Sequence, residues 1–288
     1  MLRYSMSKLG RQAGRAKGTK AELPPIEGRL STEREYYAAM RLMLAEIAKE
    51  TRESIIPAYQ SERTQKRATP DLRLDADPSW FNRLSALMLA LTRTAQNTVN
   101  DILALEAIRH TDTFIEVARR TLGINLRSVV QQDDLGDYLQ AAAARNASLI
   151  KGLADDTLKG IQQVVYNNSI AGNSVATLRA ELQKQFGISD RRARLIARDQ
   201  SAKMTGELNK LRQEQAGVTE YIFSTSRDER VRANHKAMEG RTCKWGDASV
   251  YRADDGSWRS RSGIGGVQLH PGADISCRCV GRGLVRFD

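Results

Sequence analysis

Helical periodicity runs through most of the chain between residues 31 and 216 and limits the folds open to it. In the segment 80–102, apolar side chains recur every three or four residues, which places them on one face of a helix. Ser31 is positioned to cap the first helix, and Pro57 is expected to end or kink it. The polar stretch that follows contains two prolines and indicates a connection over 61–78. Further helices are expected over 113–122, 129–168, 174–186 and 189–216, with glycines at their boundaries.

The pattern changes after Gly217. Residues 221–223 have strand character, a short helix is expected over 229–238, and Asp255-Gly256 signals the turn of a hairpin. The stretch 259–266 is basic and rich in glycine and serine, so it predicts a flexible loop. The predicted fold class is therefore α+β, with a predominantly α-helical N-terminal body over 31–216 and a small C-terminal α+β module over 217–288.

The first thirty residues differ in composition from both of these parts of the chain. Residues 1–20 carry six basic side chains, no acidic ones and several glycines, and two prolines follow within 23–28. We expect a basic flexible arm and a proline-rich spacer over residues 1–30. The arm offers a candidate site for sequence-independent DNA binding, formed by Arg3, Lys8, Arg11, Arg15, Lys17 and Lys20.

Composition narrows the functional classes. Among 288 residues, 45 are Lys or Arg and 34 are Asp or Glu, so the formal net charge is +11, which favours a polyanionic partner such as nucleic acid. The alternative is that most of these charges only solvate the outer faces of helices. Three cysteines are too few for a disulfide scaffold and fit a reducing compartment. No apolar run is long enough to span a bilayer, and there is neither a Gly-Lys-Ser/Thr phosphate loop nor a nucleophile elbow.

Two segments concentrate the residues that carry chemistry, 221–235 and 270–279. On the expected helix over 229–238, the spacing of Asp228, Arg232 and His235 places an acid, a guanidinium and an imidazole on one face. Cys277 and Cys279 are two residues apart, so both sulfurs point to the same side of an extended segment.

These side chains are candidates for a metal site. Two thiolates and an imidazole are ligands that tetrahedral zinc prefers, so His235, Cys277 and Cys279 could hold a structural zinc ion, with Cys243 or His270 as the fourth ligand. The spacing of the cysteines is not that of a known zinc motif. The alternative is a pair of small buried thiols beside a hydrogen-bonded histidine.

Several short motifs follow one another in the last part of the chain: Ile196-Ala-Arg198, Gly217 before a tyrosine-bearing strand, Thr225-Ser-x-Asp-x-Arg-Val-Arg-x-x-His235, Gly240, His270-Pro-Gly272 and Cys277-Arg-Cys279. Their order resembles the phage head morphogenesis family, the minor capsid proteins typified by protein F of phage Mu. The resemblance covers roughly the last hundred residues. One departure is that Asp199-Gln200 follow the Ile-Ala-Arg motif, where the family commonly has Thr-Glu.

The resemblance implies a minor head protein, which is not an enzyme and which associates with the portal during head morphogenesis. Such a protein is found in the virion head and, during assembly, in the host cytoplasm. Its implied partners are the portal protein, capsid or scaffold protein, and packaged DNA bound without sequence preference. In this interpretation Asp228, Arg230, Arg232 and His235 hold the small module together by charge-assisted hydrogen bonds.

A second interpretation is a metal-dependent nuclease acting on phage or host DNA. His235 would activate water, and nearby arginines would stabilise the charge on phosphorus oxygens. Nuclease metals need oxygen-rich ligand sets, and the best carboxylates available beside His235 and His270 are Asp228 and Asp274. This shortage counts against the nuclease, and the resemblance makes the structural interpretation the preferred one.

Overall fold

The computed structural model describes residues 4–68, 77–130 and 135–288. The chain forms two compact units. The mixed unit comprises Met1–Thr32, Leu103–Gln140 and Arg198–Asp288, and the helical unit comprises Glu33–Ile102 and Ala141–Ala197. These boundaries cut across the three linear segments expected from the sequence, because the long helices pass from one unit into the other.

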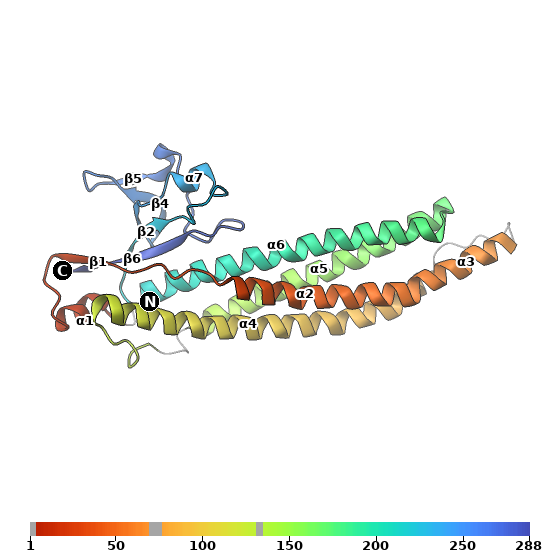
Figure 1. The fold of residues 1–288 in the computed structure, drawn as a ribbon, viewed down its shortest axis with the longest axis horizontal. Coiled ribbons are helices and arrows are strands. Elements are labelled where there is room, and N and C mark those ends of the chain that lie inside the picture. The colour runs from red at the N-terminus through yellow and green to blue at the C-terminus, as the bar shows by residue number, and fades with distance from the viewer. Residues whose placement is uncertain (1–3, 69–76, 131–134) are drawn as a thin grey trace. The chain divides into compact units, whose positions relative to one another are not determined.

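Helices account for the body expected between residues 31 and 216 (Figure 1). Their bounds are α2 Leu30–Glu50, η1 Thr51–Ile55, α3 Ile56–Ala68, η2 Pro78–Phe81, α4 Asn82–Leu122, α5 Gly136–Ala171 and α6 Val175–Gln215. The predicted α+β class with a helical body is confirmed.

The interruption expected at Pro57 takes the form of a π-helical turn. In η1 the backbone N–H of Ile56 donates to the carbonyl of Thr51, five residues earlier, and α3 continues without a break. A π turn next to proline is physically reasonable because proline cannot donate the next helical hydrogen bond. The expected connection over 61–78 is wrong for 61–68, which belong to α3, while residues 69–76 lie outside the described part of the chain.

Three predicted helix boundaries are also wrong. The helix expected from residue 129 begins at Gly136 as α5. Residues 113–122 are the last turns of α4 rather than a separate helix, and α6 runs through Gly187 and Ser189 without a break. Ser189 is buried in the helical unit, where its hydroxyl lies 2.9 Å from that of Thr157. This satisfied hydroxyl and the packing around it outweigh the helix-breaking tendency of the Gly187–Ser189 sequence. The boundary at Gly172 is confirmed, since Ser174 accepts a hydrogen bond from the N–H of Thr177 at the start of α6.

In the mixed unit, six strands form one antiparallel sheet in the order β1-β6-β2-β3-β4-β5 (Figure 1). Their bounds are β1 Thr19–Glu22, β2 Glu220–Ser224, β3 Thr242–Lys244, β4 Asp247–Arg252, β5 Trp258–Ser260 and β6 Val280–Phe287. The predicted hairpin is confirmed as β4 and β5, with Gly256 at φ +82° in its turn.

The N-terminal segment is folded, so the expectation of a flexible arm is wrong for its described residues. Helix α1 spans Met6–Gln12, and β1 pairs with the C-terminal strand β6. Met6 is fully buried in an apolar cluster that includes Phe114 and Phe287. The few apolar residues of this segment pack against residues that are far away in sequence. The high content of basic residues and glycine in the segment does not indicate such contacts.

The stretch 259–266 is also ordered, contrary to the predicted flexible loop. It completes β5 and forms the 3-10 turn η4 Arg261–Ile264, which Gly265 ends at φ +65°. Arg261 is fully buried, and its guanidinium donates to the carbonyls of Val250 and Leu269 at 3.0 and 2.9 Å. A buried arginine with these partners fixes the segment instead of leaving it in solvent.

Candidate functional site

The segment from Asp228 to His235 is mostly turn rather than helix. Only α7, Ala233–Lys236, is helical, so the expected helical face shared by Asp228, Arg232 and His235 is not formed. The Asp228 carboxylate accepts the backbone N–H of Arg230 at 3.1 Å, a local bond that competes with helix formation. Arg232 stands at the N-terminal cap of α7 in an extended conformation.

The charged residues of this segment nevertheless contact the segment that carries the cysteines. Asp228 pairs with Arg278, and Arg232 Nη1 donates to Asp274 Oδ2 at 2.9 Å. Arg232 also donates to the main-chain oxygen of Ile275 at 2.8 Å. These ion pairs link α7 and the turn before it to residues 274–279. Arg230 makes no such link and is exposed.

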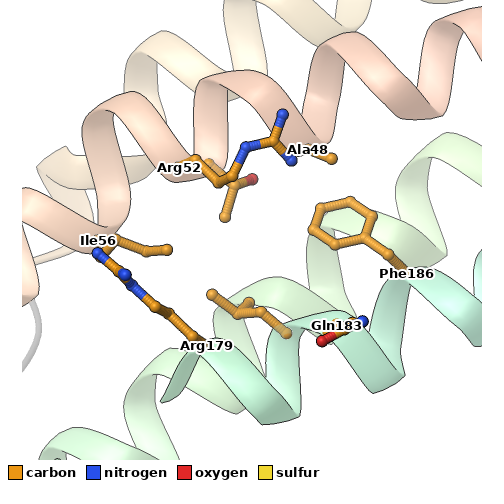
Figure 2. A pocket seen from close by; sticks show the side chains of 8 residues that line it. Ala48, Arg52, Ile56, Arg179, Gln183 and Phe186 are labelled. Carbon is orange, nitrogen blue, oxygen red and sulfur yellow. The ribbon is translucent and has the colours of Figure 1, made fainter. Parts of the chain in front are cut away.

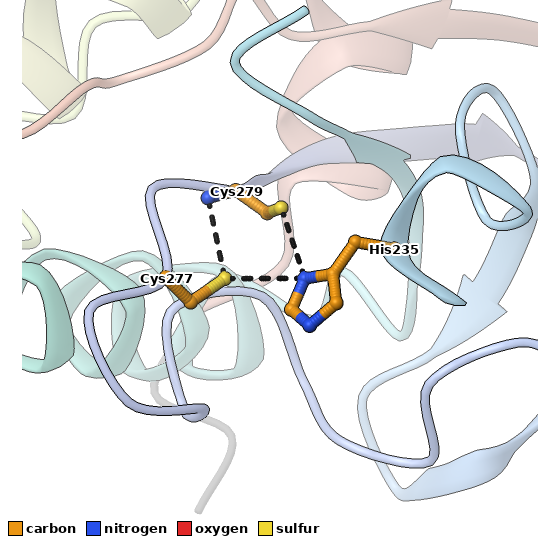
Figure 3. A group of neighbouring side chains, drawn as sticks. All are labelled: His235, Cys277 and Cys279. Carbon is orange, nitrogen blue, oxygen red and sulfur yellow. Dashed lines mark hydrogen bonds between the residues drawn. The ribbon is translucent and has the colours of Figure 1, made fainter. Parts of the chain in front are cut away.

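His235, Cys277 and Cys279 converge in the mixed unit (Figure 3). The Nδ1 atom of His235 lies 3.4 Å from the Sγ of Cys279 and 3.5 Å from the Sγ of Cys277. The three side chains are buried, and their ligand atoms all lie within 4.8 Å of one another. The two sulfurs therefore face the same imidazole nitrogen, although Cys277 lies in a turn and not on a strand.

Helix α6 supports the turn that carries Cys277. Ser276 has a positive φ of 51°, and its backbone N–H donates to the Asp199 Oδ1 at 2.9 Å. Gly206 of α6 lies against Pro271 and Gly272, where a Cβ on Gly206 would be 2.5 Å from the Pro271 carbonyl oxygen. The sequence signal for Asp199 was its place after the Ile-Ala-Arg motif, but its partner could not be inferred from sequence.

The cluster is electrostatically polarised. A hydrogen bond from the Cys279 thiol, followed by one from His235, lowers the pKa of Cys277 to about 4 despite its burial. The neighbouring Cys277 sulfur and burial raise the pKa of Cys279. The pKa of His235 is raised, mainly by its contact with Cys277 and with help from Asp274. These contacts therefore favour the thiolate form of Cys277 and the charged form of His235.

The residues expected as a fourth ligand lie in a different network. Burial raises the pKa of Cys243 to about 11, and its Sγ contacts the main-chain oxygen of Arg241 at 3.6 Å. His270 Nδ1 lies 3.1 Å from the Tyr221 hydroxyl, and burial lowers its pKa to about 4. Within the described residues, the only group of three or more potential ligands is His235, Cys277 and Cys279.

A cavity of about 220 Å³ opens beside the cluster. His235, Cys277 and Cys279 form part of its wall, and four arginines also line it, namely Arg198, Arg230, Arg232 and Arg278. The cavity is therefore strongly basic. Arg278 stands between the two cysteines in sequence, but nothing in that position alone predicts a shared cavity with Arg198.

The N-terminal basic residues lie elsewhere in the mixed unit. Lys8, Arg11, Arg15, Lys17 and Lys20 are exposed on and around α1 and β1, while Arg3 lies outside the described residues. Arg11 donates to the main-chain oxygen of Asp288 at 3.3 Å, and Arg15 donates to that of Thr121. The basic side chains are thus presented by a folded surface.

The helical unit contains a second cavity, of about 510 Å³ (Figure 2). It lies between the η1 region and α6, with Ile56, Leu182 and Phe186 supplying apolar walls. Arg52 and Arg179 also line it. No helix among the described residues is both long enough and apolar enough to cross a membrane.

An antiparallel sheet with a buried His-Cys-Cys cluster, joined to long helices, defines the structural class of this protein. Residues 159–282 match the family described as "Phage Mu protein F like protein". The match includes the whole cluster and confirms, over these residues, the resemblance to the family typified by protein F of phage Mu.

An uncharacterized protein of Haemophilus influenzae is 29% identical to this chain over 191 residues. The aligned region covers 66% of this chain but 39% of that protein, so the chain spans well under half of this relative's length. No solved structure matches the chain.

Proposed function

We propose that the protein is a structural, non-enzymatic component of phage head assembly, which docks on the portal protein during morphogenesis. The observation that carries this proposal is the match of residues 159–282 to the Phage Mu protein F like family. The expected locations are the host cytoplasm during assembly and then the virion head. Capsid or scaffold protein is a further expected neighbour.

The contacts of the matched region support a structural role for its charged motif. Asp228 pairs with Arg278, and Arg232 and His235 both contact Asp274. Charge-assisted bonds of this kind hold the segment 228–235 against the segment 274–279. The same contacts occupy the two carboxylates that a nuclease metal would require, which favours the structural proposal over the nuclease.

DNA contact is the second part of the proposal. The chain carries a formal net charge of +11, and five described basic residues are exposed around α1 and β1. Such a surface attracts the phosphate backbone without reading base sequence, and the attraction weakens with added salt.

Portal docking is tested with purified protein and rings of the portal protein encoded by the same phage or prophage. We expect the protein to co-migrate with portal rings in gel filtration and not with rings from an unrelated phage. Mass spectrometry of purified particles tests the predicted location. No association under any assembly condition, together with absence from particles, would overturn the proposal.

A further inference from the structure

We propose that His235, Cys277 and Cys279 bind one zinc ion, whose fourth coordination position opens into the arginine-lined cavity and takes an exchangeable water or oxyanion. This site goes beyond the proposed role in head assembly and does not depend on it.

The distances within the cluster suit tetrahedral zinc. Zinc binds thiolate sulfur at about 2.3 Å and imidazole nitrogen at about 2.0–2.1 Å, so a tetrahedral site has nitrogen-to-sulfur edges of about 3.6 Å. The corresponding distances from His235 Nδ1 are 3.5 Å to Cys277 Sγ and 3.4 Å to Cys279 Sγ. The two sulfurs lie within 4.8 Å of each other. Small side-chain shifts would therefore bring all three atoms into the coordination sphere of one ion.

The second ring nitrogen of His235 is oriented as in many zinc sites. Its Nε2 lies 3.0 Å from Asp274 Oδ2, while Nδ1 faces the sulfurs. The carboxylate is fixed in turn by Arg232 at 2.9 Å and by the backbone N–H of Ile275 at 2.8 Å. A carboxylate bonded to the far nitrogen sets the tautomer and orientation of a ligating histidine and makes it a better donor.

The backbone also supports the sulfur ligands. The N–H of Cys279 points to the Sγ of Cys277 at 3.4 Å, and the turn that carries Cys277 is held by Asp199. Arg198 and Arg278 line the same cavity as the two cysteines and add positive charge to it. These groups favour thiolate, the form in which cysteine binds metal.

The fourth position is open to the cavity because all three ligand residues line its wall and no further His, Cys, Asp or Glu joins the group in the described part of the chain. Two thiolates cancel the charge of the zinc ion, so the arginines leave the cavity positive. Arg232 and Arg278 form ion pairs with Asp274 and Asp228. In the described part of the chain neither Arg198 nor Arg230 forms an ion pair, although the charge of Arg230 helps to lower the pKa of Asp228. A zinc ion with three protein ligands keeps an exchangeable position, and these two arginines favour an oxyanion there.

The metal is tested on the full chain, expressed with zinc in the medium and purified without chelator. We expect one zinc per chain by mass spectrometry. The X-ray absorption spectrum at the zinc edge should show two sulfurs at about 2.3 Å and lighter ligands at about 2.0–2.1 Å. A chain free of zinc, or a zinc ion without sulfur ligands, would overturn the proposal, and neither result bears on portal docking.

Three serine variants locate the site. Cys277→Ser and Cys279→Ser should lose the zinc, whereas Cys243→Ser, the same change at another buried thiol, should keep it. Asp274→Asn should weaken zinc binding about 10–100-fold and leave the ligands in place. Circular dichroism checks that each variant is folded, and the wild-type absorption spectrum remains decisive if a ligand variant is not. Equal zinc loss in Cys243→Ser would refute the ligand assignment.

The fourth position is tested by replacing zinc with cobalt and titrating with inorganic phosphate. We expect a saturable change in the visible cobalt spectrum, with weaker phosphate binding in Arg198→Gln and Arg230→Gln. The matched control is Arg259→Gln, an exposed arginine that does not line the cavity. A cobalt spectrum unchanged at high phosphate would rule out an anion-binding position.

Discussion

The guanidinium of Arg261 donates a 2.9 Å hydrogen bond to the hydroxyl of Tyr221, and both side chains are fully buried. Tyr221 stacks on Trp245 with ring centroids 4.0 Å apart, and its hydroxyl also contacts His270. Burial raises the pKa of Tyr221, so the hydroxyl stays protonated at any physiological pH. One arginine thus ties η4 to the centre of the sheet.

Replacing Arg261 by Leu should be strongly destabilising. The change leaves Tyr221 and the carbonyls of Val250 and Leu269 without their donor, and each buried group without a partner costs about 1–3 kcal/mol. We expect the free energy of unfolding, measured with urea, to fall by about 3 kcal/mol or more. Arg259→Leu is the control, because its ion pair with Asp255 is exposed and should contribute little to stability. Equal effects in the two variants would contradict the role assigned to Arg261.

Stability should fall on acidification because of His110. It is buried beside Arg212 with Nε2 3.3 Å from Asn209 Oδ1, and burial lowers its pKa to about 4. The unfolded chain takes up this proton near pH 6.5 and the folded chain only near pH 4, so stability is lost as pH falls through that window.

The loss attributable to His110 is on the order of 3 kcal/mol. His110→Leu should flatten the pH dependence of urea unfolding between pH 6.5 and 4, even if the variant is less stable at pH 7. His270, whose pKa is also lowered to about 4 by burial, contributes to the remaining slope. Parallel pH curves for wild type and variant would show that His110 does not titrate in this way.

Replacing glycine by alanine should have opposite effects on stability at two positions of α6. In Gly187→Ala the added Cβ would contact only the Arg191 guanidinium, at 4.0 Å. The variant should therefore be more stable than the wild type by about 0.5–1 kcal/mol, because alanine has a higher helix propensity than glycine. Gly206→Ala places its Cβ 2.5 Å from the Pro271 carbonyl oxygen and should destabilise by about 1–3 kcal/mol. Thermal unfolding of both variants provides the comparison. Stabilisation by both would mean that the turn beginning at Pro271 does not pack closely on α6.

DNA affinity should depend on the N-terminal surface. The triple variant Lys8, Lys17 and Lys20→Gln should bind duplex DNA more weakly, and the dependence of log K on log salt should become shallower by up to about one unit per lost phosphate contact. The charge-matched control changes Lys49, Lys159 and Lys184, which are exposed in the helical unit. Identical salt slopes in the two triple variants would remove the N-terminal surface from the DNA proposal.

Periodicity was sufficient to predict helical character and the cap at Ser174, because both depend on neighbours within a few residues. It failed at Gly187–Ser189, where a buried contact between Ser189 and Thr157 keeps the helix intact. Strand β1 was missed because its partner β6 lies at the other end of the chain. A short strand with such a remote partner has no local signature.

The candidate site, too, could be predicted from the sequence only in part. Residue chemistry was enough to select His235, Cys277 and Cys279, which the structure brings together. The positions of Cys243 and His270 depend on how β3 and the loop before residue 271 pack, so sequence could not separate them from the cluster. The lysine- and arginine-rich composition likewise did not distinguish Arg261, which is buried in η4, from exposed basic residues such as Lys20.

The position of β6 has a consequence for how the sheet forms. This strand lies between β1 and β2, so it joins two strands that are far apart in the chain. Until β6 has paired, β1 has no neighbouring strand and one edge of β2 stays open to pairing with other chains. Completion of the sheet is therefore a non-local step, which we expect to be slower than formation of the helices.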